Sequence, residues 1–189
     1  MMAAGPSPWL ICVELRADRT TPDAPNYAPA SEAILPRLRS LLRHARDSAW
    51  FVAHVQWRDR DMRSGPIAQL EPLIDEPVFY LDAPSAFSIA RLHERVTEQP
   101  GAALHFVGFA AYDVILPSLI AGRDLGLRVV LIEDAIASSA SDAWREDHIV
   151  GLLKTQLTSI VLKTSADVMA DRGAPVVDIR DFTHGGNRR

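Results

Sequence analysis

The chain has 189 residues, of which 48% are hydrophobic and 23% charged, which excludes a disordered or fibrous protein and predicts one globular domain with a sizeable core. Its net charge of −4, without a run of like charges, argues against nucleic acid and anionic membranes as partners. The single cysteine, Cys12, excludes an intrachain disulfide and a cysteine-rich metal site, and predicts a cytoplasmic protein. Only Lys154 and Lys163 are lysines, so a catalytic lysine or cysteine has almost no candidates.

The first half of the chain alternates predicted strands and helices. A buried strand is expected at 9–13, and a helix follows at 31–45, with Ser31 as a possible cap and Pro36 placing the true start a few residues later. A second strand at 50–55 runs into a charged loop, and a short strand is expected at 78–80.

The second half continues the alternation. We expect helices at 90–96, 112–125, 142–157 and 166–169, and strands at 104–107, 128–132, 160–162 and 176–177. Residues 102–122 are nearly apolar, but Gly108, Asp113 and Pro117 interrupt them, which favours a buried strand, turn and helix over a membrane span. The start of the chain has no signal-peptide pattern.

This alternation predicts a three-layer α/β/α, Rossmann-like fold with a mostly parallel sheet. One domain would cover residues 1–189, with a core at about 9–180 and a flexible tail at 183–189. No glycine-rich phosphate loop is present. In such sheets ligands bind beyond the carboxyl ends of the strands. The residues that follow the predicted strands are Glu14 and Arg16, 54–61, 81–87, 109–114 and 133–135.

Several strand-end motifs together resemble the isochorismatase-like, or cysteine hydrolase, superfamily, which includes nicotinamidases and N-carbamoyl amide hydrolases. The resemblance covers about residues 9–169. The motifs that carry it are Trp-Leu-Ile-Cys-Val-Glu-Leu-Arg-Ala-Asp at 9–18, Ser-Ala-Phe at 85–87, Gly-Phe-Ala-Ala-Tyr-Asp-Val at 108–114 and Asp-Leu-Gly-Leu-Arg-Val-Val-Leu-Ile-Glu-Asp-Ala at 124–135.

The resemblance implies a catalytic triad of Asp, Lys and Cys, in which the Cys thiolate attacks an amide carbonyl. Matched position by position, this chain has Glu14 for the Asp, Leu81 for the Lys and Val114 for the Cys. Valine has no nucleophilic atom and leucine no charge, so the covalent mechanism is unavailable at these positions. Cys12 is expected to be a buried small apolar residue rather than a substitute nucleophile.

The resemblance also implies that backbone N–H groups at the turn into the helix, at Ala110 and Ala111, form an anion-binding site beside a non-proline cis peptide. Asp113 is placed to cap those donors, while Tyr112 and Phe87 are placed to fill the substrate's space. Three further candidates for a ligand pocket lie after the first two strands, at Arg16, Trp57 and Arg58, and a solvated loop is the alternative for the Trp57-Arg58 pair.

The histidines on the predicted strands suggest a metal site or a place in the core. His54, Asp59 and Asp61 lie where some members of the superfamily bind a metal, but their spacing does not match that set, so we expect no metal and no cofactor. His105 is predicted to be a hydrogen-bonded core residue.

We therefore expect a non-catalytic pseudo-hydrolase that binds a small molecule or a protein partner. The alternative is a divergent hydrolase of an amide or vinyl ether that uses Glu14 as acid or base. A purely structural role for Glu14, in which its carboxylate caps a nearby backbone group or pairs with Arg16, is also open. The resemblance implies a homo-oligomer, a dimer or larger.

Overall fold

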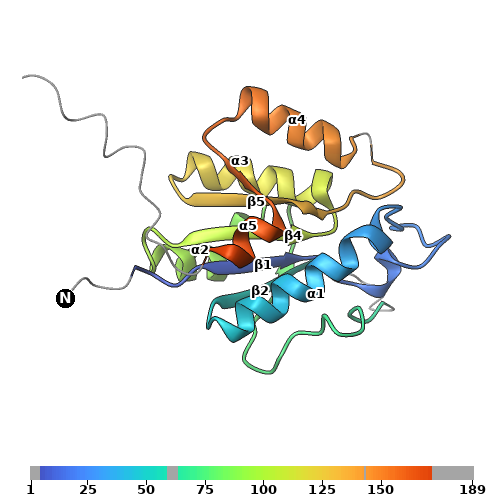
Figure 1. Cartoon of the computed structure of the whole chain (residues 1–189), viewed down its shortest axis with the longest axis horizontal. Helices are drawn as coiled ribbons and strands as arrows, with labels where there is room; N and C mark the ends of the chain where they lie inside the picture. The colour runs from blue at the N-terminus through green and yellow to red at the C-terminus, as the bar shows by residue number, and fades with distance from the viewer. Residues whose placement is uncertain (1–4, 59–63, 143, 172–189) are drawn as a thin grey trace, which may run out of the picture.

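The computed structural model of the chain describes residues 5–58, 64–142 and 144–171. Six parallel strands form one sheet in the order β3-β2-β1-β4-β5-β6 (Figure 1). The strands are β1 (Trp9–Val13), β2 (Phe51–Trp57), β3 (Val78–Leu81), β4 (Ala103–Gly108), β5 (Arg128–Ile136) and β6 (Val161–Lys163). This confirms the predicted α/β fold with a parallel sheet.

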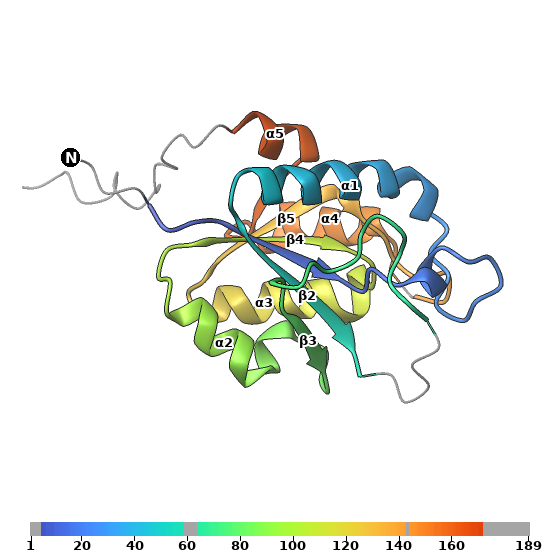
Figure 2. The ribbon, with the colours of Figure 1, turned by 90° about the horizontal axis from the view of Figure 1, so that it is seen from below.

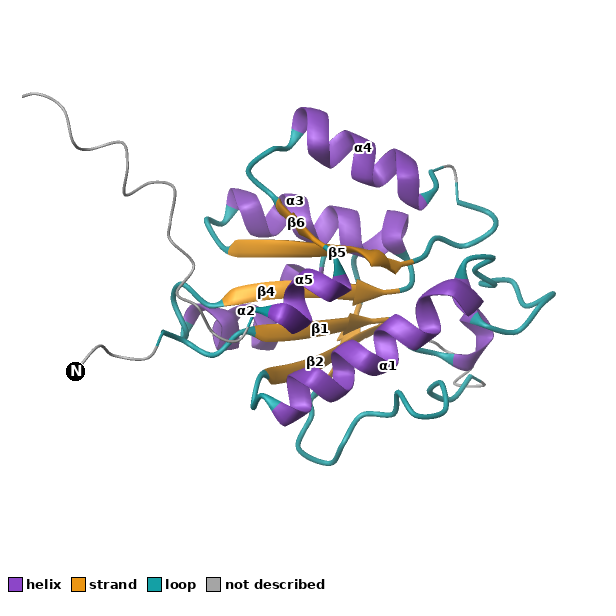
Figure 3. Cartoon of the chain, viewed as in Figure 1, coloured by secondary structure: helices purple, strands orange, loops and turns teal. Residues whose placement is uncertain are grey.

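Helices cover both faces of the sheet, as Figure 2 shows for α1 and α5 on one side and α2 and α3 on the other. The helices are α1 (Ser31–Asp47), α2 (Ala90–Thr97), α3 (Leu116–Asp124), α4 (Glu146–Gln156) and α5 (Ser165–Ala170). Figure 3 shows the same layers by type of structure. No helix among the described residues is both long and apolar enough to cross a membrane.

Strand alternation divides the core into two apolar clusters, one on each face. Trp9, Ile11 and Val13 of β1 point into the cluster shared with α2, α3 and α4, whereas Leu10 and Cys12 point into the cluster shared with α1 and α5. Because successive strand residues face opposite ways, a side chain at a strand end belongs to one face or the other. The two faces are named below the α3 face and the α1 face.

Some predicted boundaries need correction. β2 extends to Trp57, and β5 continues through residues 133–135, which were expected to follow the strand, because a register irregularity lets Ile136 pair with Gly108. The helix expected from residue 112 is a π-helical turn, η3 (Ala111–Ile115), followed by α3. The helix expected from residue 142 begins at Glu146. The strand expected at 176–177 and the tail lie outside the described residues.

The start of α1 also differs from the expectation. Ser31 is the first helical residue and not the cap, a place that Ala30 takes without a side-chain hydrogen bond. Pro36 lies inside the helix and does not delay its start. Ile34 and Leu38 are buried on either side of Pro36, so packing of this face against the sheet outweighs the one backbone hydrogen bond that a proline lacks.

His105 is a hydrogen-bonded core residue, as predicted. It is 5% exposed, and its Nδ1 lies 3.1 Å from the carbonyl oxygen of Trp9. Its ring is 4.7 Å from that of Trp50. Burial lowers the pKa of His105 to about 4, so the imidazole is neutral at physiological pH.

Candidate functional site

The carboxyl ends of β1, β2, β3 and β4 meet at one edge of the sheet. β1 ends before Glu14, β2 ends at Trp57, β3 at Leu81 and β4 at Gly108. All four strands are parallel neighbours in the sheet, so this edge is where a ligand would be expected.

Glu14 is held in a buried ion pair. Its carboxylate oxygen Oε2 accepts a hydrogen bond from Arg19 Nη2 at 2.7 Å, and Oε1 accepts one from the backbone N–H of Trp57. Arg19 Nη1 in turn donates to Ser139 Oγ at 2.7 Å, and both charged residues are less than 5% exposed. The carboxylate therefore joins three segments of the chain. Of the two structural roles expected for Glu14, it does cap a nearby backbone N–H, that of Trp57, but its ion-pair partner is Arg19 and not Arg16.

The backbone at Glu14 is unusual for a residue other than glycine. Its φ is +55°, in the left-handed region, which side chains with a Cβ adopt rarely. Its N–H still continues the ladder to the carbonyl oxygen of Val55, at 2.9 Å, while its own carbonyl oxygen accepts from the N–H of Arg16 at 2.8 Å. The strand therefore turns sharply at this residue.

Leu81 and Val114, where the family resemblance led us to expect the replaced Lys and Cys, are closed off from solvent. Leu81 is 1% exposed and Val114 0% exposed, and both belong to the apolar cluster of the α3 face. Phe87 belongs to the same cluster and reaches α3, where a Cβ added to Gly122 would meet its Cε2 at 2.7 Å. These side chains form a packed core and not the wall of an open site.

The turn after β4 is shaped by Gly108. Its φ is +113°, and an added Cβ would lie 2.2 Å from the carbonyl oxygen of Val13, so no other residue fits there without a shift of the backbone. Ala110 is left-handed as well, with φ +56°. None of the described peptide bonds is cis, unlike the turn that the family resemblance implied.

The backbone donors of this turn are partly occupied. The N–H of Ala111 donates to the carbonyl oxygen of Ala137 at 3.2 Å, while those of Val114 and Ile115 donate to that of Ala110. Asp113 is exposed and makes no capping hydrogen bond, so the expected cap is wrong. Tyr112 is half-buried, with its ring 6.1 Å from that of Trp144.

Arg58 points away from Glu14. Its Nε lies 2.8 Å from Asp82 Oδ1, its guanidinium lies 5.8 Å from the centre of the Tyr80 ring, and both partners of the ion pair are well exposed. Arg58 and Glu14 therefore do not converge on one cavity. The solvated-loop interpretation holds for Arg58.

A cavity of about 270 Å³ opens at the same edge of the sheet but on the α1 face. Cys12 and His54 are paired across β1 and β2, and Gln56 and Tyr80 across β2 and β3. The cavity is lined by Cys12, Leu15, Arg16, His54, Val55, Gln56, Trp57, Ser64, Gly65, Pro66, Pro72 and Tyr80. Of the predicted binding residues, Arg16 and Trp57 are brought together here, while Phe87, Ala110, Ala111, Tyr112 and Asp113 are not.

The back of this cavity is a charged cluster that the sequence analysis missed. His54 Nε2 lies 3.0 Å from Glu76 Oε2, and Arg46 makes two hydrogen bonds to the same carboxylate, at 2.7 and 2.9 Å. Despite partial burial, which raises it, the pKa of Glu76 is lowered to about 2 by its hydrogen bonds to Arg46, to the N–H of Leu73 and to His54. A buried histidine on a strand was the only sequence signal for this cluster.

Cys12 lies in the wall of this cavity and is 1% exposed. Burial raises the pKa of its thiol well above the usual range, and the charge of Glu76 raises it further. The thiolate required of a nucleophile is therefore disfavoured, in agreement with the prediction of an inert buried residue. Asp59 and Asp61 lie outside the described residues, and within those residues no group of three or more potential ligands could hold a metal ion.

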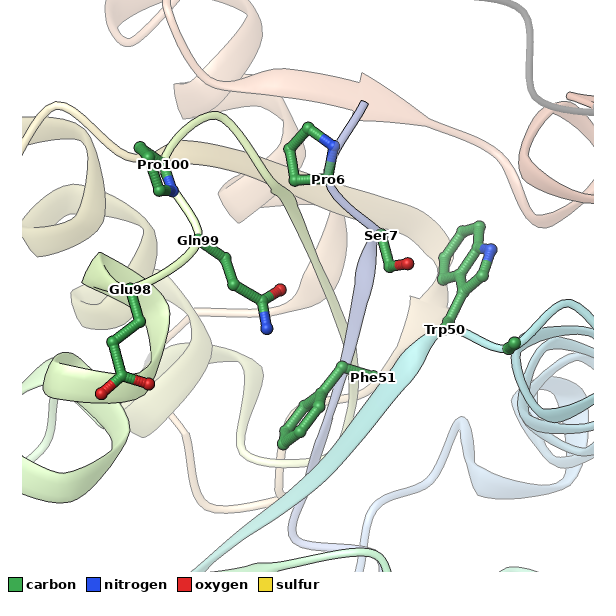
Figure 4. A pocket seen from close by; sticks show the side chains of 8 residues that line it. Pro6, Ser7, Trp50, Phe51, Glu98, Gln99 and Pro100 are labelled. Carbon is green, nitrogen blue, oxygen red and sulfur yellow. The ribbon is translucent and has the colours of Figure 1, made fainter. Parts of the chain in front are cut away.

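A second hollow, of about 510 Å³, lies at the opposite, amino ends of the strands. Figure 4 shows its lining, which comes from the segment before β1, from residues 49–51 at the entry to β2 and from residues 98–100 just after α2. The Nε1 of Trp9 donates to Gln99 Oε1 there, at 3.0 Å. Open parallel sheets bind ligands at their carboxyl ends, so this hollow is the weaker candidate.

The fold has many solved relatives. An isochorismatase-like hydrolase from Alkaliphilus metalliredigens is 17% identical with a TM-score of 0.74, over 87% of this chain and 98% of that one. An isochorismatase from Pseudomonas putida is 23% identical with a TM-score of 0.71, over 84% and 88% of the two chains. N-carbamoylsarcosine amidase from Thermoplasma acidophilum is 16% identical with a TM-score of 0.67, over 84% and 96%.

These identities support a shared fold and nothing finer. Comparison with curated protein sequences gives no match. The model of the isochorismatase domain, however, matches residues 8–166, which is most of the chain and includes every strand described above. The chain therefore belongs to the isochorismatase family.

Proposed function

We propose that this protein is a member of the isochorismatase family that has lost hydrolysis and acts by binding a small molecule. The observation that carries the proposal is the burial of Leu81 and Val114 in one apolar cluster, at the positions where the family's chemistry needs a Lys and a Cys. Neither side chain can supply a charge or a nucleophile.

The alternative, a divergent hydrolase that uses Glu14, has less support. A general acid must carry a proton to give away, whereas Glu14 accepts hydrogen bonds at both oxygens from Arg19 and from the N–H of Trp57. Its 2% exposure also leaves little room for a substrate or water at the carboxylate. The contacts of Glu14 favour a structural role.

A small molecule is favoured over a protein partner because the cavity on the α1 face is concave and combines charged, polar and apolar walls. A homo-oligomer remains our expectation from the family. Measurement of the mass in solution at micromolar concentration tests it, and a monomeric mass would contradict it.

Turnover assays test the loss of hydrolysis. The purified protein is incubated with simple amides, N-carbamoyl amino acids and isochorismate, and we expect no product above the uncatalysed rate. Turnover that survives Cys12→Ala but vanishes in Glu14→Gln, with both variants folded by circular dichroism, would overturn the proposal in favour of the Glu14 mechanism.

A further inference from the structure

His54 places a hydrogen-bond acceptor in the wall of the α1-face cavity. Glu76 is ionised at neutral pH, so the Nε2 of His54 must carry the proton and donate to it. The other ring nitrogen, Nδ1, is then the acceptor. No hydrogen bond between described residues reaches Nδ1, although His54 is only 3% exposed.

Arg16 brings a positive charge to the same cavity. Its side chain is 8% exposed, and its Nε forms an ion pair with Asp18 Oδ1 at 3.6 Å. The oxygens of Asp18 accept from Ser64 Oγ at 2.8 Å and from Asn26 Nδ2 at 3.0 Å. A guanidinium carries five N–H donors and binds several acceptors at once, so Arg16 can bind a ligand carboxylate in addition to the partners that it already has.

Apolar surface and size set further limits on a ligand. Leu15, Pro66, Pro72 and the ring of Tyr80 supply apolar wall between the polar groups. The volume of about 270 Å³ corresponds to roughly nine waters, which suits a molecule of about ten non-hydrogen atoms. Such a ligand needs a compact apolar body with polar groups at its ends.

We propose that this cavity binds a small carboxylic acid that also carries a hydroxyl or N–H donor, an inference that rests on the proposed function of small-molecule binding. The carboxylate lies against Arg16, and the donor bonds to Nδ1 of His54. The site is separate from the family's catalytic positions, because Leu81 and Val114 pack on the opposite face of the sheet and Glu14 does not line the cavity.

Three probes of matched shape test this recognition by isothermal titration calorimetry. 3-Hydroxybenzoate carries both groups, benzoate lacks the hydroxyl and phenol lacks the carboxylate. We expect 3-hydroxybenzoate to bind about fivefold more tightly than benzoate and at least about tenfold more tightly than phenol, since a charge-assisted contact contributes more than a neutral one. Equal affinities, or no binding of 3-hydroxybenzoate at 10 millimolar, would overturn the proposal.

Matched variants test the location. An added side chain at Gly65, which lines the cavity, meets open space, and the same is true of Gly5, outside it. We expect Gly65→Leu to lose 3-hydroxybenzoate binding and Gly5→Leu to keep it. His54→Gln should remove the preference for 3-hydroxybenzoate over benzoate, with thermal melting as the check on folding.

Failure of the proposed ligand site and failure of the proposed loss of hydrolysis would show in different experiments. Binding that Gly65→Leu leaves intact would overturn the site, whatever the turnover assays give. Turnover of an amide or of isochorismate would overturn the loss of hydrolysis, even if 3-hydroxybenzoate bound in the cavity as proposed.

Discussion

The two faces of the sheet are built differently at the carboxyl ends of β1, β2 and β3. On the α3 face, Leu81 and Val114 lie in an apolar cluster, at the positions that we propose correspond to the family's Lys and Cys. On the α1 face, Arg16 and His54 line a cavity backed by a charged cluster. The same strand ends therefore support a closed core on one face and a polar cavity on the other.

The largest loss of stability is expected when a charge is placed in the apolar cluster of the α3 face. Leu81→Lys would place an ammonium group in the α3-face cluster without a carboxylate partner, and we expect a loss of about 4 kcal/mol in the free energy of unfolding. Urea denaturation measures it. Leu81→Met, which conserves volume, is the control, with an expected loss below about 1.5 kcal/mol. A Leu81→Lys variant as stable as the wild type would mean that this position is open to water.

The ion pair of Glu14 and Arg19 is expected to be structural. Glu14→Leu leaves the Arg19 guanidinium buried and without its carboxylate, and should lower stability by about 3 kcal/mol. The double variant Glu14→Leu/Arg19→Leu should recover much of that loss, because it removes the uncompensated charge. Chemical denaturation of the wild type, Glu14→Leu, Arg19→Leu and the double variant gives the coupling energy. A double variant no more stable than Glu14→Leu would contradict a simple ion-pair role.

Acid should weaken the α1 face through Glu76. The pKa of this group is lowered from 4.5 to about 2 in the folded protein, so its stabilisation is complete above the unfolded value and is lost as the pH falls toward 2. At pH 3 the expected loss is about 2 kcal/mol relative to pH 6, as an upper value for a group that retains some contact with solvent. Glu76→Gln should be less stable at pH 7 and show a flatter pH dependence between pH 5 and 3.

Protonation of His54 should also lower the stability of the folded protein as the pH falls, but at a higher pH than Glu76 does. Burial lowers its pKa below 6.5, so the unfolded chain binds the proton more readily and stability falls as the pH drops below 6.5. Denaturation curves from pH 7 to 3 for the wild type and Glu76→Gln separate the two groups. A wild-type stability that stays constant over this range would contradict the assignment.

The smallest change in stability is expected when Arg58 is replaced. Its ion pair with Asp82 is exposed, so Arg58→Ala should leave the melting temperature nearly unchanged. It should also leave 3-hydroxybenzoate binding unchanged, because Arg58 does not line the cavity. A marked loss of binding in this variant would assign Arg58 to the ligand site.

The sequence allowed the fold to be predicted because its signals are local. Continuous apolar runs such as residues 9–13, alternating with amphipathic segments such as 31–45, indicate a parallel sheet covered by helices. The end of β5 was missed because it depends on a register irregularity opposite Gly108, which no local pattern encodes. Ser31 was misplaced for a similar reason, since cap geometry depends on the incoming backbone.

The candidate site was predicted less well because its contacts join distant segments. Glu14 stood out at a strand end, but its partners Arg19 and Trp57 come together with it only in the folded chain, where Arg19 also binds Ser139. The pairing of His54 with Glu76 depends on how residues 64–77 return to the sheet. The proposed replacement of the family's Lys and Cys, in contrast, rests on the local motifs alone and stays a prediction.

Thiol reactivity at position 114, which we propose corresponds to the family's nucleophile, tests the closed α3 face most directly. In a Cys12→Ala background, a cysteine is introduced at position 114 by Val114→Cys, and its reaction with a small disulfide reagent is followed. The control Cys12→Ala/Tyr112→Cys places the thiol at a half-buried neighbour. We expect Val114→Cys to react at least about a hundredfold more slowly than the same chain in denaturant, because labelling must wait for opening of the core. Rates for Val114→Cys that match the Tyr112→Cys control would contradict a closed site.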